Sequence, residues 1–91
     1  MLSVVWRARA QGNLTEVIRY IAERNPVAAR RMKALIEQSI LPAAEHPYLF
    51  RPGRLAGTRE VVAHPNYVVV YRVTKMHIEV VNVLHTRQQY P

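Results

Sequence analysis

Residues 58–84, TREVVAHPNYVVVYRVTKMHIEVVNVL, decide the fold. They hold three runs rich in β-branched and aromatic residues, which are Thr58–Ala63, Tyr67–Thr74 and His77–Leu84. Only His64-Pro65-Asn66 and Lys75-Met76 separate the runs. Because connections this short join antiparallel neighbours, the stretch predicts a three-stranded antiparallel meander.

The middle and last runs are apolar on both faces. Since side chains alternate along a strand, the middle run has one set on each face, namely Tyr67, Val69, Tyr71 and Val73 against Val68, Val70 and Arg72. Strict alternation divides the last run into Ile78, Val80 and Leu84 on one side and Val81 and Val83 on the other. A sheet with one face in water alternates apolar and polar residues instead. We therefore expect both faces to be covered.

The residues before this stretch predict one strand and two helices. Ser3–Trp6 is short and apolar and is expected to be an edge strand. From Leu14 to Ala22 apolar residues recur with the helical period. Asn25-Pro26 then places a capping residue and a proline at the start of a second helix of about 19 residues, which Pro42 is expected to kink.

Together these elements predict one α+β domain over residues 1–91, in the order β-α-α-β-β-β, with a loop over Glu45–Gly57. The helix hairpin covers one face of the sheet. The other face is covered either by the loop and the C-terminal residues or by a second chain. We favour a second chain, because a monomer seldom exposes an apolar patch of more than a few hundred Å².

Composition excludes several classes of protein. The chain has 91 residues, 49% of them hydrophobic, and no cysteine, so it is globular and has neither disulfides nor a thiolate zinc site. Its four histidines lack metal-binding spacing, and we expect no metal and no cofactor. No apolar run is long enough for a membrane span or a signal peptide, so a cytoplasmic location and no membrane partner are expected.

The charge is extreme, with 13 Lys and Arg against 6 Asp and Glu and a net charge of +7. Such a surface serves solubility or attracts an anion: nucleic acid, an acidic protein segment or a membrane face. Most of the cations are arginines, whose planar fork holds carboxylate or phosphate with two hydrogen bonds. Because no helix-turn-helix, zinc-finger or RNA-binding aromatic motif is present, an acidic protein segment is preferred to free nucleic acid.

The ordered set of motifs resembles the RelE/ParE superfamily of bacterial toxin-antitoxin toxins, on the ParE branch. The resemblance rests on the Asn-Pro helix start and on three segments, Gly57-Thr58-Arg59-Glu60, Pro65 to Val73 and Val83-Leu84-His85-Thr86-Arg87-Gln88. It implies a two-layer toxin that forms a hetero-oligomer with a cognate acidic antitoxin. In the ParE branch the released toxin inhibits DNA gyrase by protein-protein interaction.

The RelE branch of the superfamily instead cleaves messenger RNA on the ribosome. RelE-like nucleases typically carry an arginine directly after the tyrosine of the central strand, where this chain has Val68. Valine neither binds phosphate nor moves a proton, so the resemblance favours an inhibitor over an enzyme. The alternative is a metal-independent endoribonuclease site built from Arg59, Arg72, His85 and Tyr90. A second alternative is a non-toxic interaction module of the same fold.

Two predicted surfaces supply the candidate binding residues. One is the sheet face away from the helices, and the other is the helix hairpin together with the C-terminal segment. If the second sheet face binds the antitoxin, its contacts are Arg59, Val68, Val70 and Arg72. Ion pairs of the two arginines with Glu60 or Glu79 are the structural alternative. Candidates for target binding lie on the helix hairpin and the C-terminal segment, and they are Arg19, Arg30, Arg31, His85, Arg87 and Tyr90.

Overall fold

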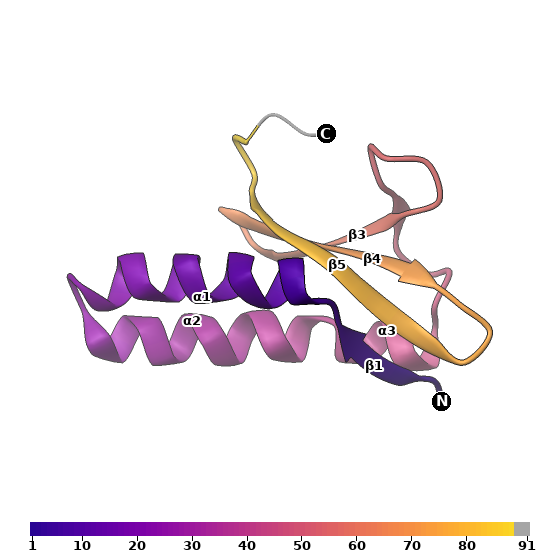
Figure 1. Ribbon diagram of the computed structural model, residues 1–91, viewed down its shortest axis with the longest axis horizontal. Coiled ribbons are helices and arrows are strands. Elements are labelled where there is room, and N and C mark those ends of the chain that lie inside the picture. The colour runs from indigo at the N-terminus through magenta and orange to yellow at the C-terminus, as the bar shows by residue number, and fades with distance from the viewer. Residues whose placement is uncertain (89–91) are drawn as a thin grey trace.

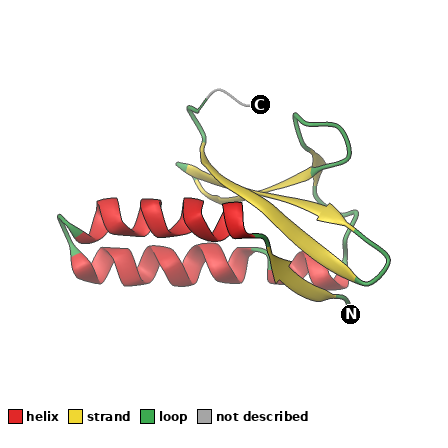
Figure 2. Ribbon diagram, in the orientation of Figure 1, coloured by secondary structure: helices red, strands yellow, loops and turns green. Residues whose placement is uncertain are grey.

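The computed structural model describes residues 1–88 and has the expected α+β architecture, with a layer of helices packed on one sheet (Figures 1 and 2). In chain order the elements are β1 (Ser3–Trp6), α1 (Ala8–Ala22), α2 (Pro26–Ser39), α3 (Leu41–Glu45), β2 (Arg51–Pro52), β3 (Arg59–His64), β4 (Tyr67–Val73) and β5 (His77–His85). The three strands of the predicted meander therefore begin and end within one residue of their expected limits.

The sheet has five strands in the order β1-β5-β4-β3-β2. The meander β3-β4-β5 is antiparallel, as predicted, and Ser3–Trp6 forms an edge strand. β1 runs parallel to β5, with Ser3 beside His77 and Trp6 beside Val80. The first and last strands of the described chain are thus neighbours, and the helices lie in the connection between β1 and the rest of the sheet.

The helix hairpin begins its second arm as the sequence predicts, but that arm is shorter than expected. Asn25 Oδ1 accepts a hydrogen bond from Ala28 N at 3.1 Å, and Pro26 occupies the first helical position. The expectation of one helix of about 19 residues is wrong, because α2 ends at Ser39 and the chain restarts as α3. Pro42 has no N–H to donate to the preceding turn, and so it divides the helix rather than only kinking it.

The main core lies between the helices and the sheet, and Tyr71 of β4 is its largest fully buried side chain. The Tyr71 hydroxyl donates to the Pro47 carbonyl at 2.5 Å, and the Tyr71 ring meets the Phe50 ring edge to face at 6.4 Å between centroids. Burial raises the pKa of Tyr71, against the opposing charge of Arg59. One side chain thereby fixes the path of the loop that connects the helices to the sheet.

That loop contains β2, which the sequence analysis missed. Arg51 pairs with Glu60 and Pro52 with Arg59 along the outer edge of β3. A strand of two residues, one of them proline, has no periodic pattern to detect, and proline is tolerated only at such an edge. Among the described residues, no helix is long and apolar enough to cross a membrane.

Replacing Tyr71 with phenylalanine tests how firmly the loop is held. Tyr71→Phe is expected to lower the free energy of unfolding by about 1–2 kcal/mol, because the Pro47 carbonyl loses its donor. Urea denaturation measures the change. Tyr48→Phe, at an exposed position on the same loop, is the control and is expected to have little effect. Equal losses in the two variants would contradict the role assigned to the hydroxyl.

Candidate functional site

A β-bulge decides which side chains reach the second face, by which we mean the sheet face opposite α1 and α2. Val70 of β4 pairs with Asn82 and Tyr71 pairs with Val80, which leaves Val81 without an opposite residue. The extra residue reverses the alternation that follows it. Val83 therefore packs in the helix-side core and Leu84 on the second face, and the expected assignment of these two residues is wrong.

The apolar centre of the second face is buried within this chain. Val68 and Val70 are 2% and 0% exposed, and they form a small cluster with Leu84 and the partly buried Val81. A second chain was the favoured cover for these residues, but the chain alone already buries them.

The chain turns back over this face after β5. Thr86 N donates to the Asn66 carbonyl at 2.8 Å, and Gln88 N donates to the His85 carbonyl at 2.9 Å. Arg54, from the loop before β3, donates through Nη1 to the Gln88 carbonyl at 3.2 Å. Because β4 lies between β3 and β5, this contact joins the segment before β3 to the segment after β5 across the width of β4.

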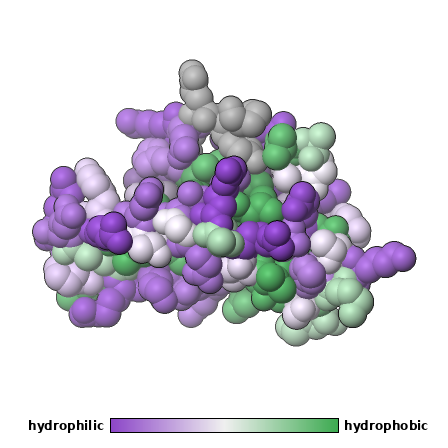
Figure 3. Space-filling view, in the orientation of Figure 1, coloured by the Kyte–Doolittle hydropathy of each residue, from purple (hydrophilic) through white to green (hydrophobic). Residues whose placement is uncertain are grey.

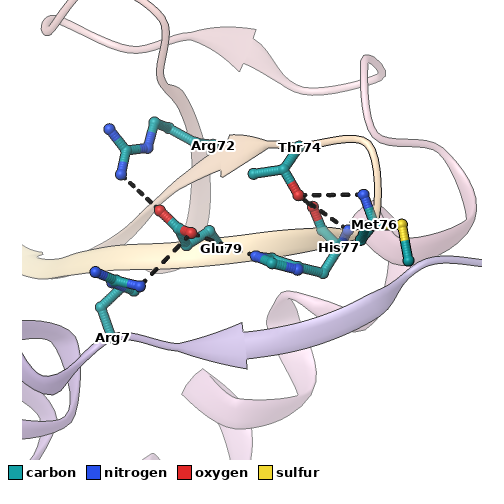
Figure 4. A network of polar contacts seen from close by, with 6 residues as sticks. All are labelled: Arg7, Arg72, Thr74, Met76, His77 and Glu79. Carbon is teal, nitrogen blue, oxygen red and sulfur yellow. Dashed lines mark hydrogen bonds and ion pairs between the residues drawn. The ribbon is translucent and has the colours of Figure 1, made fainter.

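One end of the second face carries a charged cluster centred on Glu79, a buried residue of β5 (Figure 4). Arg72 Nη2 donates to Glu79 Oε1 at 2.5 Å, and Arg7 Nη1 lies 3.9 Å from Oε2. His77 Nε2 lies 3.3 Å from the same Oε2. Hydrogen bonds from Arg72 and then His77 lower the pKa of Glu79. The carboxylate thus ties together β4, β5 and the end of β1.

A second cluster of the same kind surrounds Glu60, which is also buried. Arg51 Nη2 lies 3.1 Å from Glu60 Oε1, while Arg54 contacts Oε2 through its backbone N at 3.2 Å and through Nε at 3.8 Å. In the Glu79 and Glu60 clusters alike, one buried carboxylate is shared by two arginines whose side chains are about half exposed. Because these guanidinium groups are partly exposed, carboxylates of another molecule can reach them.

The candidate residues for antitoxin binding do not share a face. Arg72 lies on the second face and pairs with Glu79, which confirms one of the proposed ion pairs. Arg59 is in register with Tyr71 and so lies on the helix side. Its Nη1 donates to the Phe50 carbonyl at 2.8 Å and the Tyr48 carbonyl at 3.3 Å, and its guanidinium lies over the Tyr48 ring. The expected contact of Arg59 with Glu60 is absent among the described residues.

The residues of the alternative nuclease site do not converge. Arg59 and Arg72 lie on opposite faces, as the register shows. His85 pairs with Tyr67 at the other end of β4 from Arg72, a separation of about 17 Å along the strand. Tyr90 lies outside the described residues. Within residues 1–88 no group of three or more metal-ligating side chains comes together either.

The candidate target-binding cations lie apart from one another. Arg19, Arg30 and Arg31 are exposed on the helix hairpin, whereas Arg87 is exposed beyond β5. The sequence analysis missed Arg7, Arg51 and Arg54 as site residues. Arg7 is far along the chain from Glu79, whereas Arg51 and Arg54 lie close to Glu60 in sequence but in a segment without a periodic pattern. The short interval between Arg51 and Arg54 beside a Pro-Gly pair was the one signal available.

Comparison with known proteins gives a consistent result. The family model described as the ParE toxin of the type II toxin-antitoxin system parDE matches residues 4–90. Y4kP of Sinorhizobium fredii is 39% identical over 87 residues, which cover 94% of this chain and 90% of Y4kP. Toxin RelE2 of Caulobacter vibrioides is 37% identical over 87 residues, covering 93% of this chain and 96% of RelE2. The solved structure of a chromosomal ParDE TA system from P. aeruginosa superposes with a TM-score of 0.83 at 18% identity, covering 93% of this chain and 96% of that one.

The Glu79 cluster predicts a pH dependence of stability. Because the folded pKa of Glu79 is below its ordinary value of 4.5, its contribution is complete above that value and is lost as the pH falls through the lowered folded value. Glu79→Gln is therefore expected to destabilise the protein at pH 7 but to matter much less in strong acid. Urea midpoints of variant and wild type across this range give the difference.

The matched control for this prediction is Glu45→Gln. Glu45 is exposed on α3 and forms no ion pair within residues 1–88. Its replacement is expected to leave the midpoint nearly unchanged at every pH. If Glu79→Gln destabilised the protein equally at pH 7 and in acid, the assigned charge interactions would not be the cause.

Proposed function

Because the chain belongs to the ParE toxin family of type II toxin-antitoxin systems, we propose that it inhibits DNA gyrase by direct binding and that a cognate antitoxin neutralises it. The match of the ParE family model to residues 4–90 is the observation that carries this proposal. We infer gyrase as the target from the resemblance of the sequence motifs to the ParE branch. We infer the antitoxin from membership of a type II toxin-antitoxin family.

The geometry of the second face supports an inhibitor rather than a ribonuclease. Val68 occupies the position where the nuclease branch carries an arginine, and this valine is buried. Arg59, Arg72 and His85 are too far apart to act on one phosphate. General acid-base cleavage needs its groups within hydrogen-bond reach of the same bond. The described residues provide no such arrangement. Ribonuclease activity is nevertheless one of the outcomes that the experiment below can detect.

We place the antitoxin contact at the Arg72 end of the second face. Arg72 and Arg7 share Glu79 and keep free donors, which suits an acidic antitoxin segment. Val68 and Val70 are buried, so a partner reaches them only if the residues that cover them move. Arg59 is excluded from it, because its guanidinium is held by loop carbonyls on the helix side.

We place the gyrase contact on the helix hairpin and the segment after β5. The hairpin extends beyond the sheet (Figure 1), and the side seen in Figure 3 is mainly hydrophilic. Arg19 and Arg30 are exposed there, and His85 and Arg87 offer cations or donors at the other surface. An exposed hairpin of this kind can reach a protein partner without disturbing the core.

A supercoiling assay tests the target. Purified protein is expected to inhibit gyrase-catalysed supercoiling or to trap cleaved DNA, and addition of antitoxin is expected to restore activity. Primer extension on cellular messenger RNA, performed after expression, is the second measurement. Codon-register cuts with unaffected gyrase would support the ribonuclease instead, and harmless expression with neither effect would support a non-toxic interaction module.

Arg72→Gln tests the antitoxin contact. The variant is expected to bind antitoxin about tenfold more weakly, because it loses a charge that faces the partner. Isothermal titration calorimetry measures the affinity. Lys75→Gln makes the same change of charge on the exposed β4–β5 turn and is the control. Similar losses in both variants would indicate a general charge effect rather than a contact at Arg72.

A further inference from the structure

The far end of α1 carries an exposed tyrosine stacked on an arginine. Of the large hydrophobic side chains of α1, only Tyr20 is exposed, with 59% of its surface accessible. The guanidinium of Arg24 lies over the Tyr20 ring, with Cζ 4.0 Å from the ring centroid. Arg24 Nη1 also donates to the Tyr20 carbonyl at 3.0 Å, and so satisfies a carbonyl in the last turn of the helix. Two contacts to the same residue therefore hold the arginine on the ring.

This pair lies on the side of α1 that adjoins β5. Asn13 marks that side, because its Oδ1 accepts a hydrogen bond from Val83 N at 3.1 Å. Tyr20 follows Asn13 by seven residues, which at 3.6 residues per turn returns it to within about 20° of the same direction. It lies about 10 Å farther along the helix axis, where the hairpin extends beyond the sheet (Figure 1). Neither the core nor the two arginine-containing clusters use it.

The stacked arrangement suits the pair for binding a protein. Tyrosine and arginine are among the residues that contribute most of the binding energy at protein interfaces. Binding normally has to immobilise long side chains, which costs conformational entropy. Because Arg24 is already held on Tyr20 in the free protein, this cost is reduced. The pair is therefore organised before a partner arrives.

The charges near the pair favour a protein over nucleic acid. Glu16 and Glu23 are exposed four residues before and three residues after Tyr20. Carboxylates so close to the ring oppose a phosphate backbone, which binds to clustered positive charge. Arg24 forms no ion pair within residues 1–88, so its charge is available to one carboxylate of a partner. A second copy of this chain would bring another net charge of +7, which opposes self-association.

We propose that Tyr20 and Arg24 form the main contact with gyrase, with the ring in an apolar pocket of the enzyme and the guanidinium on a carboxylate beside it. The inference rests on the proposed function. It narrows the hairpin surface assigned to gyrase to two residues at one end of α1, neither of which the sequence analysis named.

Variants of the two residues test the contact. Tyr20→Ala and Arg24→Gln are each expected to weaken gyrase binding about tenfold or more. Tyr20→Phe keeps the ring and is expected to change the affinity less than about twofold. Tyr48→Ala is the matched control for the ring, because Tyr48 is 67% exposed and lies over Arg59 at 5.0 Å. Lys75→Gln, on the exposed β4–β5 turn, is the control for the charge.

Titration calorimetry with intact gyrase gives the affinities, the supercoiling assay gives the inhibition, and circular dichroism melting checks that each variant folds. Equal losses for Tyr20→Ala and Tyr48→Ala, or undiminished binding by Tyr20→Ala or Arg24→Gln, would overturn the proposal. So would wild-type protein that binds a short DNA duplex without gyrase and loses that binding in Arg24→Gln, because the pair would then serve DNA. Light scattering that shows a dimer, dissociated by Tyr20→Ala, would assign the pair to a second copy.

Failure of this inference can be told apart from failure of the proposed function. If wild-type protein inhibits gyrase and the two variants inhibit it equally well, only the assignment of the contact is wrong. If wild-type protein neither binds nor inhibits gyrase, the proposed target is wrong, and the contact is rejected with it.

Discussion

A strand that is apolar on both faces needs two covers, and the arrangement of this protein follows from that requirement. β4 places Tyr71 against the helices and Val70 against the second face, and both side chains are fully buried. α1 and α2 supply the first cover. On the second face the chain turns back after β5, and Arg54 joins that segment to the loop before β3. The apolar centre of this face is buried within the protein itself.

The two buried carboxylates explain how charge is distributed on the second face. Glu60 is held by two arginines from the segment just before β3, and Glu79 is held by Arg72 of the adjacent strand and by Arg7 from the other end of the chain. A buried carboxylate without cationic partners costs free energy of folding. Each carboxylate therefore favours the strand register that brings its arginines close. Each of these arginines stays partly exposed, and a guanidinium has more donors than one carboxylate can accept. The side chains that form the structural ion pairs are therefore also the ones proposed to bind an acidic partner.

Much of the fold could be predicted from local sequence, and the parts that could not depend on single irregularities. The strands, the Asn25-Pro26 helix start and the edge position of β1 follow from periodicity and capping. The bulge at Val81 could not be predicted, because a run of valines gives no sign of which one lacks a partner. β2 and the division of the helix near Pro42 are too short to leave a pattern.

The candidate site was predictable only in part. Arg72 and Glu79 lie on adjacent strands joined by a tight turn, so their pairing could be anticipated. The contacts of Arg7 and Arg54 depend on how distant segments pack, which local patterns do not determine. Burial of Val68 depends on how the segments around the second face pack, and alternation along a strand does not determine that packing.

The parallel pairing of β1 with β5 has a consequence for biosynthesis. Val83 N donates to Asn13 Oδ1 across 70 residues of sequence, and Arg7 N donates to the Val80 carbonyl. At ordinary rates of translation, the ribosome takes roughly 4 to 14 s to synthesise the 70 residues between Asn13 and Val83. Contacts so distant in sequence also slow folding. The nascent polypeptide consequently cannot complete its sheet until β5 has emerged from the ribosome.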